Sequence, residues 1–276
     1  MSQGNYWDFC KDNEGRFVIE NGKGYLLSAV STIHNYESPQ TAIICHGLFS
    51  SKENRLCQTI AKHLSINAVR FDFHGNGESQ GAESWSFGDY HGEVDHDIRR
   101  VVEFLREKGL EIKAIIGHSR GGVETLMYSW MYDDVDIIIG ISARFDLANS
   151  IITRFISDEH YEQLKKKEVE YVDIVPRDNI PRKITLECIN RRNLVDYNML
   201  KTVKNTKYFL LIHGTKDDIV PVQDSSEIAK FIPPQIPHEI VLIEDGSHSL
   251  TENSEIRSLV NHHINRVICA LLNKKM

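Results

Sequence analysis

The chain has 276 residues, 41% of them hydrophobic, and its 32 Lys and Arg against 39 Asp and Glu give a formal net charge of −7. This length can bury a large core, and the acidic balance argues against nucleic acid or an anionic membrane surface as the main partner. No apolar run approaches the roughly 20 residues of a membrane span. Residues 1–8 lack the basic and apolar regions of a signal peptide, and the five cysteines are scattered without Cys-x-x-Cys spacing. We therefore expect a cytoplasmic protein with free thiols.

Strand-like and helix-like segments alternate along most of the chain. Residues 16–20 and 24–34 are typical of a pair of N-terminal strands, and apolar strands are predicted near residues 41, 68, 113, 135, 208 and 239. Segments of helical length lie between them, at 54–64, 89–108 and 225–231, and a last helix carries apolar residues at helical spacing from Ile256 to Leu272. This pattern predicts an α/β fold with a mostly parallel central sheet flanked by helices.

The most specific motif is a serine between two glycines, Gly117-His118-Ser119-Arg120-Gly121. It follows an apolar segment at 111–116, and apolar residues continue after it at helical spacing. A chain that leaves a strand and enters a helix so sharply leaves no room for side chains two residues before and after the serine. The motif therefore predicts a nucleophile elbow with Ser119 as the nucleophile.

A serine nucleophile needs a histidine base and a carboxylate that orients the histidine, which in this kind of site follow in the order serine, acid, histidine. Among the histidines beyond residue 200, only His248 lies in a short polar loop after an apolar strand, so it is the predicted base. Structural positions are expected for the others, which lie at strand ends or on the last helix, namely His213, His238, His262 and His263.

The predicted acid is Asp217, which lies just beyond the apolar strand that starts near residue 208. Two alternatives stay open: its neighbour Asp218, and Asp146, which follows the strand near residue 135. Any of these aspartates could instead be a solvated turn residue.

An oxyanion needs backbone amides, one of them normally from the residue after the serine and one from a loop near the first central strand. Arg120 supplies the first amide. The strand near residue 41 runs directly into His46-Gly47-Leu48-Phe49, so Leu48 is the predicted second donor. Only the amides of these two residues are needed for this role.

Two other motifs are weaker. Gly75, Gly77 and Gly81 resemble a dinucleotide loop, but Gln80 stands where the third glycine of Gly-x-Gly-x-x-Gly is required. Possible metal ligands gather on a predicted helix, without a His-Glu-x-x-His motif, and fit a solvated helix surface better, namely Asp89, His91, Asp95, His96 and Asp97. We therefore expect neither a cofactor nor a metal.

Together these motifs resemble the α/β-hydrolase superfamily, and the chain is similar to its small serine esterases, which include cinnamoyl and feruloyl esterases and serine-aminopeptidase-like hydrolases. The matching pieces are His46-Gly47-Leu48-Phe49, Asp72-Phe73-His74-Gly75-Asn76-Gly77-Glu78-Ser79, Gly117-His118-Ser119-Arg120-Gly121-Gly122, His213-Gly214-Thr215-Lys216-Asp217 with Val220-Pro221, and Gly246-Ser247-His248. The resemblance implies a catalytic Ser119, Asp217 and His248, with Leu48 and Arg120 as oxyanion donors.

The resemblance also implies one domain over residues 1–276, with a small cap inserted at about 146–200, where the alternation stops and charged residues are frequent. The alternative for this stretch is a solvated insertion that contacts nothing.

The expected function is hydrolysis of carboxylic esters of a small-molecule acyl substrate, through an acyl-enzyme and without a cofactor. A thioesterase, a peptidase or an acyltransferase could use the same residues, because many chemistries share this fold. A ligand receptor that retains the pocket with little turnover is an alternative from another class.

Overall fold

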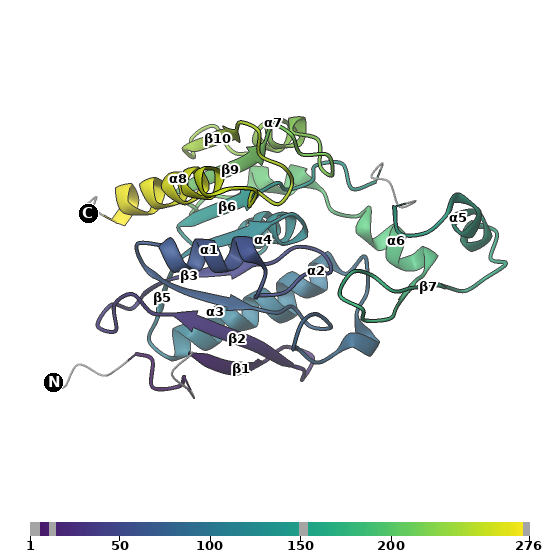
Figure 1. Ribbon diagram of the computed structural model, residues 1–276, viewed down its shortest axis with the longest axis horizontal. Helices are drawn as coiled ribbons and strands as arrows, with labels where there is room; N and C mark the ends of the chain where they lie inside the picture. The colour runs from purple at the N-terminus through teal and green to yellow at the C-terminus, as the bar shows by residue number, and fades with distance from the viewer. Residues whose placement is uncertain (1–5, 11–14, 149–153, 273–276) are drawn as a thin grey trace.

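A mixed sheet of eight strands forms the centre of the computed structural model, which describes residues 6–10, 15–148 and 154–272 (Figure 1). The strand order is β1-β2-β4-β3-β5-β6-β9-β10. β1 and β2 pair antiparallel, as do β2 and β4, and the remaining pairs are parallel. The strands are β1 (Arg16–Glu20), β2 (Leu26–Thr32), β3 (Gln40–Cys45), β4 (Asn67–Phe71), β5 (Glu111–His118), β6 (Ile137–Ile141), β9 (Tyr208–Gly214) and β10 (His238–Ile243). This confirms the predicted fold class.

Helices cover both faces of the sheet, so its central strands are buried on both sides, as their continuous apolar sequences predict. On one face α1 (Arg55–His63) and α8 (Ser254–Leu272) pack their apolar sides against the strands. On the other face lie α3 (Arg99–Glu107), α4 (Arg120–Met131) and α7 (Gln223–Ala229). Burial of each large aliphatic side chain in these layers contributes about 1.5–3 kcal/mol.

The helix predicted at 89–108 differs from the structure in its interior. The chain forms α2 (Tyr90–Gly92), then a π-helical segment at Glu93–Ile98, and only then α3. Apolar spacing cannot reveal a π turn, because Val94 and Ile98 are four residues apart and are buried in either kind of helix. The other predicted elements differ from the observed ones by a few residues at their ends, the least reliable part of any assignment.

Residues 154–192, inserted in the chain between β6 and β9, form a small layer of their own (Figure 1). The turns that follow, at Tyr197–Thr202, pack into the main core instead. The layer contains α5 (Asp158–Lys165), a two-stranded antiparallel sheet of β7 (Val172–Ile174) and β8 (Arg182–Ile184), and α6 (Leu186–Arg192). A separate apolar cluster joins this layer to Phe49, Trp85 and Phe87 of the loops beside the main sheet. Residues 149–153 of the predicted cap lie outside the described residues, and the role of the layer as a cap stays a prediction.

Within the ranges that the structure describes, no helix is both long enough and apolar enough to pass through a membrane.

A buried ion pair anchors the loop that follows β4. The side chains of Lys52 and Asp72 are 0% exposed, and Lys52 Nζ lies 2.7 Å from Asp72 Oδ2 and 2.7 Å from Glu78 Oε2. Asp72 also accepts hydrogen bonds from the backbone N–H groups of Lys52 (2.5 Å) and Glu78 (2.9 Å). At Gly77, where φ is +53°, an added Cβ would lie 2.3 Å from this carboxylate. The loop that resembles a dinucleotide motif therefore closes around Asp72.

Replacing Lys52 with methionine should lower the free energy of unfolding by about 3–5 kcal/mol, because it leaves the buried carboxylate of Asp72 without its counter-charge. Urea denaturation measures this change. Lys216→Met is the matched control: Lys216 pairs with Asp245 at the surface, where their side chains are 70% and 64% exposed, so its loss should matter little. Equal midpoints for the two variants would contradict the prediction.

Candidate active site

Ser119 occupies the sharp turn between β5 and α4. Its backbone has φ 56° and ψ −117°, a conformation that L-residues rarely adopt. An added Cβ on Gly117 would lie 2.0 Å from the carbonyl oxygen of Gly121, and one on Gly121 would lie 2.4 Å from that of His46. Neither position can carry a side chain, which confirms the steric reason for expecting glycine on both sides of the serine. The backbone N–H of Ser119 donates to Ile141 O at 2.8 Å and anchors the turn to β6.

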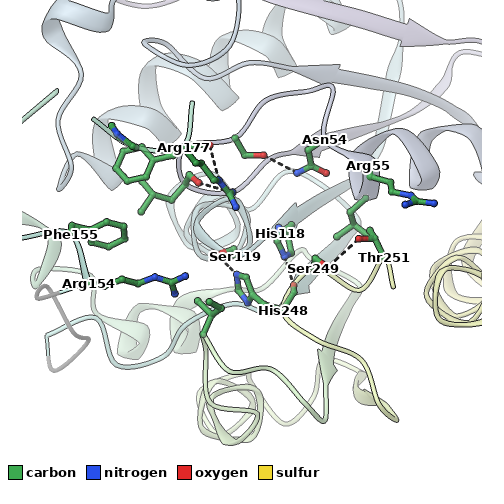
Figure 2. A pocket seen from close by; sticks show the side chains of 17 residues that line it. Asn54, Arg55, His118, Ser119, Arg154, Phe155, Arg177, His248, Ser249 and Thr251 are labelled. Atoms are coloured by element: carbon green, nitrogen blue, oxygen red, sulfur yellow. Dashed lines mark hydrogen bonds between the residues drawn. The ribbon is translucent and has the colours of Figure 1, made fainter. Parts of the chain in front are cut away.

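The structure brings Ser119, His248 and Asp217 into one hydrogen-bonded chain. Ser119 Oγ lies 2.9 Å from His248 Nε2 (Figure 2). His248 Nδ1 lies 2.8 Å from Asp217 Oδ2. The three residues follow β5, β10 and β9, whose carboxyl ends meet at one edge of the parallel sheet. His248 contacts Asp217 rather than the sequence alternatives Asp218 and Asp146.

Asp217 is held by four groups. Its Oδ1 accepts the backbone N–H groups of Ile219 (2.9 Å) and Val220 (2.8 Å), and its Oδ2 lies 3.2 Å from Nε2 of His213 as well as near His248. Burial alone would raise the pKa of Asp217, but the hydrogen bonds from His213 and His248 outweigh burial and hold this pKa well below its usual range. The carboxylate therefore stays ionised and keeps Nδ1 of His248 protonated.

His213 is structural, as its position at a strand end predicts, but it also contacts the acid. Its ring is 0% exposed, with Nδ1 2.8 Å from Ser225 Oγ and Nε2 3.1 Å from the carbonyl oxygen of Val220. Its position four residues before Asp217 is the signal that sequence analysis did not use.

His118 supports the base, and sequence analysis missed this contact. Its Nε2–H donates to the backbone carbonyl of His248 at 2.7 Å, so the strand that carries the nucleophile also holds the loop that carries the base. Burial, followed by the nearby His248 ring, lowers the pKa of His118 to about 3. A neutral His118 avoids placing a second positive charge beside His248 when that base takes up a proton.

The loop from His46 to Phe49 passes directly beside the nucleophile. An added Cβ on Gly47 would lie 3.2 Å from Ser119 Cβ, so the loop is in contact with the serine. Arg177 fixes it: Nε donates to Phe49 O at 3.1 Å and Nη2 to Leu48 O at 3.2 Å (Figure 2). Arg120 begins α4, where the first backbone N–H groups of a helix have no partner within the helix. Both predicted oxyanion donors thus flank Ser119.

The side chain of Arg120 turns away from this role and is buried behind the elbow. Its Nε lies 2.7 Å from Glu93 Oε2 and 2.8 Å from Glu124 Oε1, and its guanidinium lies 4.0 Å above the Tyr90 ring. Burial and the neighbouring Glu93 raise the pKa of Glu124 well above its usual range, so this cluster holds fewer charges than its residue types suggest. The π-helical segment thus supplies Glu93 as the ion-pair partner of Arg120 in α4.

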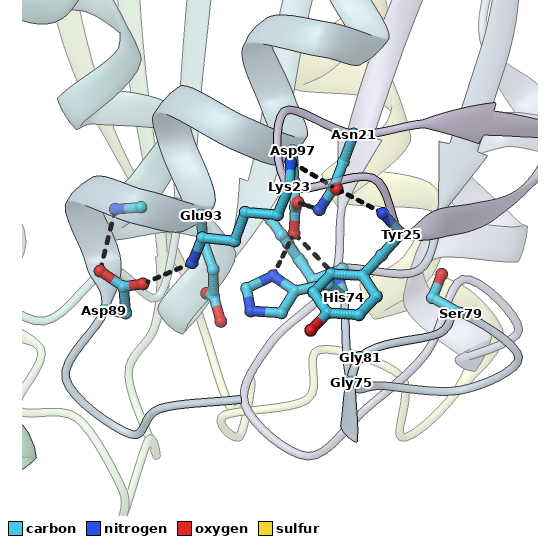
Figure 3. Close-up of polar contacts among 12 residues, drawn as sticks. Asn21, Lys23, Tyr25, His74, Gly75, Ser79, Gly81, Asp89, Glu93 and Asp97 are labelled. Carbon is cyan, nitrogen blue, oxygen red and sulfur yellow. Dashed lines mark hydrogen bonds and ion pairs between the residues drawn. The ribbon is translucent and has the colours of Figure 1, made fainter. Parts of the chain in front are cut away.

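Two of the aspartates weighed as metal ligands have other partners. Asp97 accepts from Asn21 (2.7 Å) and from the backbone of His74 (2.9 Å), and it lies 2.8 Å from His74 Nδ1 (Figure 3). Asp89 pairs with Lys23 at 3.1 Å and with Arg191 at 2.8 Å. Across the described ranges, no three His, Cys, Asp or Glu side chains are grouped as a metal would require.

Two adjoining cavities meet at Ser119. The first, of about 490 Å³, is lined by the His46–Phe49 loop, by His118 and His248, and by residues of the inserted layer. The second, of about 690 Å³, continues along α4 and the loop after β9. Leu48, Ser119, Arg154, Phe155 and Ile219 line both. A substrate can therefore place one arm on each side of the serine.

Comparison with known proteins agrees with the observed α/β-hydrolase fold. A family model described as alpha/beta hydrolase fold matches residues 42–158. Curated relatives include palmitoyl-protein thioesterase ABHD10, mitochondrial, of Bos taurus, which is 25% identical over 217 residues that cover 74% of this chain and 64% of that protein. The human protein of the same name is also 25% identical over 217 residues, with the same coverage. The match thus spans just under two thirds of these relatives' length.

Solved structures share the fold over almost the whole chain. The esterase Est1E of Butyrivibrio proteoclasticus, solved with ferulic acid bound, has a TM-score of 0.74 and 19% identity, over 94% of this chain and 100% of Est1E. Mouse alpha/beta hydrolase domain-containing protein 10 has a TM-score of 0.67 and 21% identity, over 93% of this chain and 99% of that protein.

The half-buried, neutral His118 predicts a pH dependence of stability. An unfolded histidine titrates at a pKa of about 6.5, whereas the pKa of folded His118 is about 3. Between these values the unfolded chain binds the extra proton, so His118 lowers the stability of the protein as the pH falls below about 6.5. His118→Gln should remove this loss.

The free energy of unfolding of His118→Gln, relative to the unmodified protein, should therefore rise on acidification, by at most about 1.4 kcal/mol per pH unit. Urea denaturation of both proteins at pH 7, 6 and 5 measures this difference. A difference that does not change with pH would show that His118 is not buried in its neutral form.

Proposed function

Since the chain belongs to the α/β-hydrolase superfamily of serine hydrolases, we propose that it hydrolyses carboxylic esters with Ser119 as nucleophile, His248 as general base and Asp217 as the orienting acid. The observation that carries this proposal is the 2.9 Å contact between Ser119 Oγ and His248 Nε2 at the strained elbow. It places the proton acceptor within direct reach of the hydroxyl.

In the first half-reaction, His248 Nε2 takes the Ser119 proton while Oγ attacks the ester carbonyl. The imidazolium that forms is stabilised by the ionised Asp217, and it then gives its proton to the departing alcohol. Asp217 keeps its own charge throughout, because two backbone amides and His213 hold it in addition to His248.

The negative oxygen of the tetrahedral intermediate would be bound by the amides of Leu48 and Arg120. Preorganised donors of this kind are worth about 3–4 kcal/mol each in related sites. Arg177 supports the Leu48 amide, because it holds the carbonyls of Leu48 and Phe49 on its own side of the loop. Water then attacks the acyl-enzyme, with His248 again as base.

Thioester hydrolysis is the second candidate. The curated relatives named palmitoyl-protein thioesterase favour it, and the same nucleophile, base and amides would serve, because a thioester carbonyl passes through the same kind of tetrahedral intermediate. For either reaction, we propose that the inserted layer acts as the cap expected at about 146–200 and shapes the substrate cavities. The cytoplasmic location expected from the sequence stays a prediction.

Purified protein should hydrolyse p-nitrophenyl butyrate, and Ser119→Ala should lower kcat by at least about 10³-fold because it removes the nucleophile. Release of p-nitrophenol measures the rate. Ser226→Ala, on the exposed side of α7, is the control and should keep the activity. Unchanged turnover in Ser119→Ala would refute the proposed nucleophile, and a single burst without steady turnover would favour a receptor.

Asp217 and Asp218 provide a matched pair of variants. Asp217→Asn should lower kcat by about 10⁴-fold, because an asparagine favours the wrong tautomer of the base histidine. Asp218→Asn should have a far smaller effect, because Asp218 does not contact His248. Similar losses in both variants, measured as kcat on the same ester, would contradict the assignment of Asp217.

A further inference from the structure

The charges around the first cavity differ from those of the chain as a whole. The formal net charge of the protein is −7. Yet three arginines line this cavity, Arg55, Arg154 and Arg177, and no aspartate or glutamate is among the described residues that line it. The lining histidines do not offset this, since a histidine carries no negative charge.

These arginines also lack the carboxylate partners that most other described arginines have. Arg99, Arg182 and Arg266, for example, each pair with a carboxylate at 2.8 Å or less. Among residues 6–10, 15–148 and 154–272, no carboxylate lies within ion-pair distance of Arg55, Arg154 or Arg177. Positive charge at the mouth of the site is therefore not neutralised from within the described chain.

Two of the three arginines point toward the nucleophile. In Figure 2 the side chains of Arg154 and Arg177 extend toward Ser119 from the inserted layer, whereas that of Arg55 points outward. Arg177 uses Nε and Nη2 to hold the Leu48 and Phe49 carbonyls, which leaves Nη1 for a ligand. Arg154 lines both cavities.

The carboxylates near Ser119 do not neutralise the arginines of the first cavity. Asp217 is occupied by His213, His248 and two amides. Asp218 is exposed and lines only the second cavity. The second cavity also has arginines, but Asp217 and Asp218 are part of its lining, so the two sides of Ser119 differ in their acidic residues.

We propose that the substrate carries an anionic oxygen group, a carboxylate or a phosphate, on the arm that occupies the first cavity, where Arg154 and Nη1 of Arg177 bind it. This inference rests on the proposed function, since it concerns the same Ser119 site. Planar guanidinium groups match both kinds of oxyanion, and their hydrogen bonds to charged oxygens are the stronger ones. The other arm lies in the second cavity, whose lining includes Asp217 and Asp218.

Matched substrate pairs test the inference. For a carboxylate, p-nitrophenyl hydrogen succinate is compared with p-nitrophenyl butyrate, and for a phosphate, acetyl-coenzyme A with the acetyl thioester of N-acetylcysteamine. We expect kcat/KM to be about 10-fold or more higher for the anionic member of at least one pair. A preference in the succinate pair identifies a carboxylate, and one confined to the coenzyme A pair identifies a phosphate.

Arg154→Gln should lower the ratio of kcat/KM between the anionic and neutral members by about 10-fold. Arg100→Gln removes the same charge from a surface pair on α3 and should leave the ratio unchanged. Absence of any preference in both pairs, or a ratio that Arg154→Gln does not alter, would overturn the inference while ester turnover left the proposed function standing.

Binding to Ser119→Ala separates the inference from the reaction. This variant cannot form the acyl-enzyme, so isothermal titration with the two intact p-nitrophenyl esters and the two intact thioesters reports affinity alone. Tighter binding of the anionic member of a pair, weakened by a second Arg154→Gln change, supports the inference even if no ester is turned over. Equal affinities within both pairs would overturn it.

Discussion

The backbone conformation of Ser119 is the constraint on which the rest of the site depends. A serine backbone with φ 56° is an unfavourable conformation, and it persists only because the packing around it excludes other conformations. The close approach of Gly117 to Gly121, and of Gly121 to His46, provides this confinement, and the hydrogen bond to Ile141 ties the turn to the sheet. Parallel strands then bring the loops of Asp217 and His248 to the same edge.

The titratable groups around Ser119 are each stabilised in one charge state. The carboxylate of Asp217 is stabilised as an anion by four donors, whereas His118, directly beside His248, is kept neutral by burial. Behind the elbow, the charge of Arg120 is balanced by Glu93. The arginines that line the first cavity, by contrast, have no carboxylate within ion-pair distance among the described residues.

Much of the fold could be predicted from the sequence, because buried parallel strands and amphipathic helices follow local periodicity. The convergence of Ser119, Asp217 and His248 could also be predicted, because each lies in a loop after a strand and chain order restricts their roles. Long-range polar contacts could not be predicted from the sequence. The hydrogen bond from His118 to the His248 carbonyl, the contact of His213 with Asp217 and the π-helical segment that carries Glu93 all depend on tertiary pairing that no periodicity records.

The bonds from Arg177 to the carbonyls of Leu48 and Phe49 join the inserted layer to the loop beside the nucleophile. If the layer swings outward to admit a large ligand, these bonds break and the loop loses its brace. A change in the inserted layer would therefore alter the backbone beside Ser119, although no residue of that layer belongs to the hydrogen-bonded chain of Ser119, His248 and Asp217.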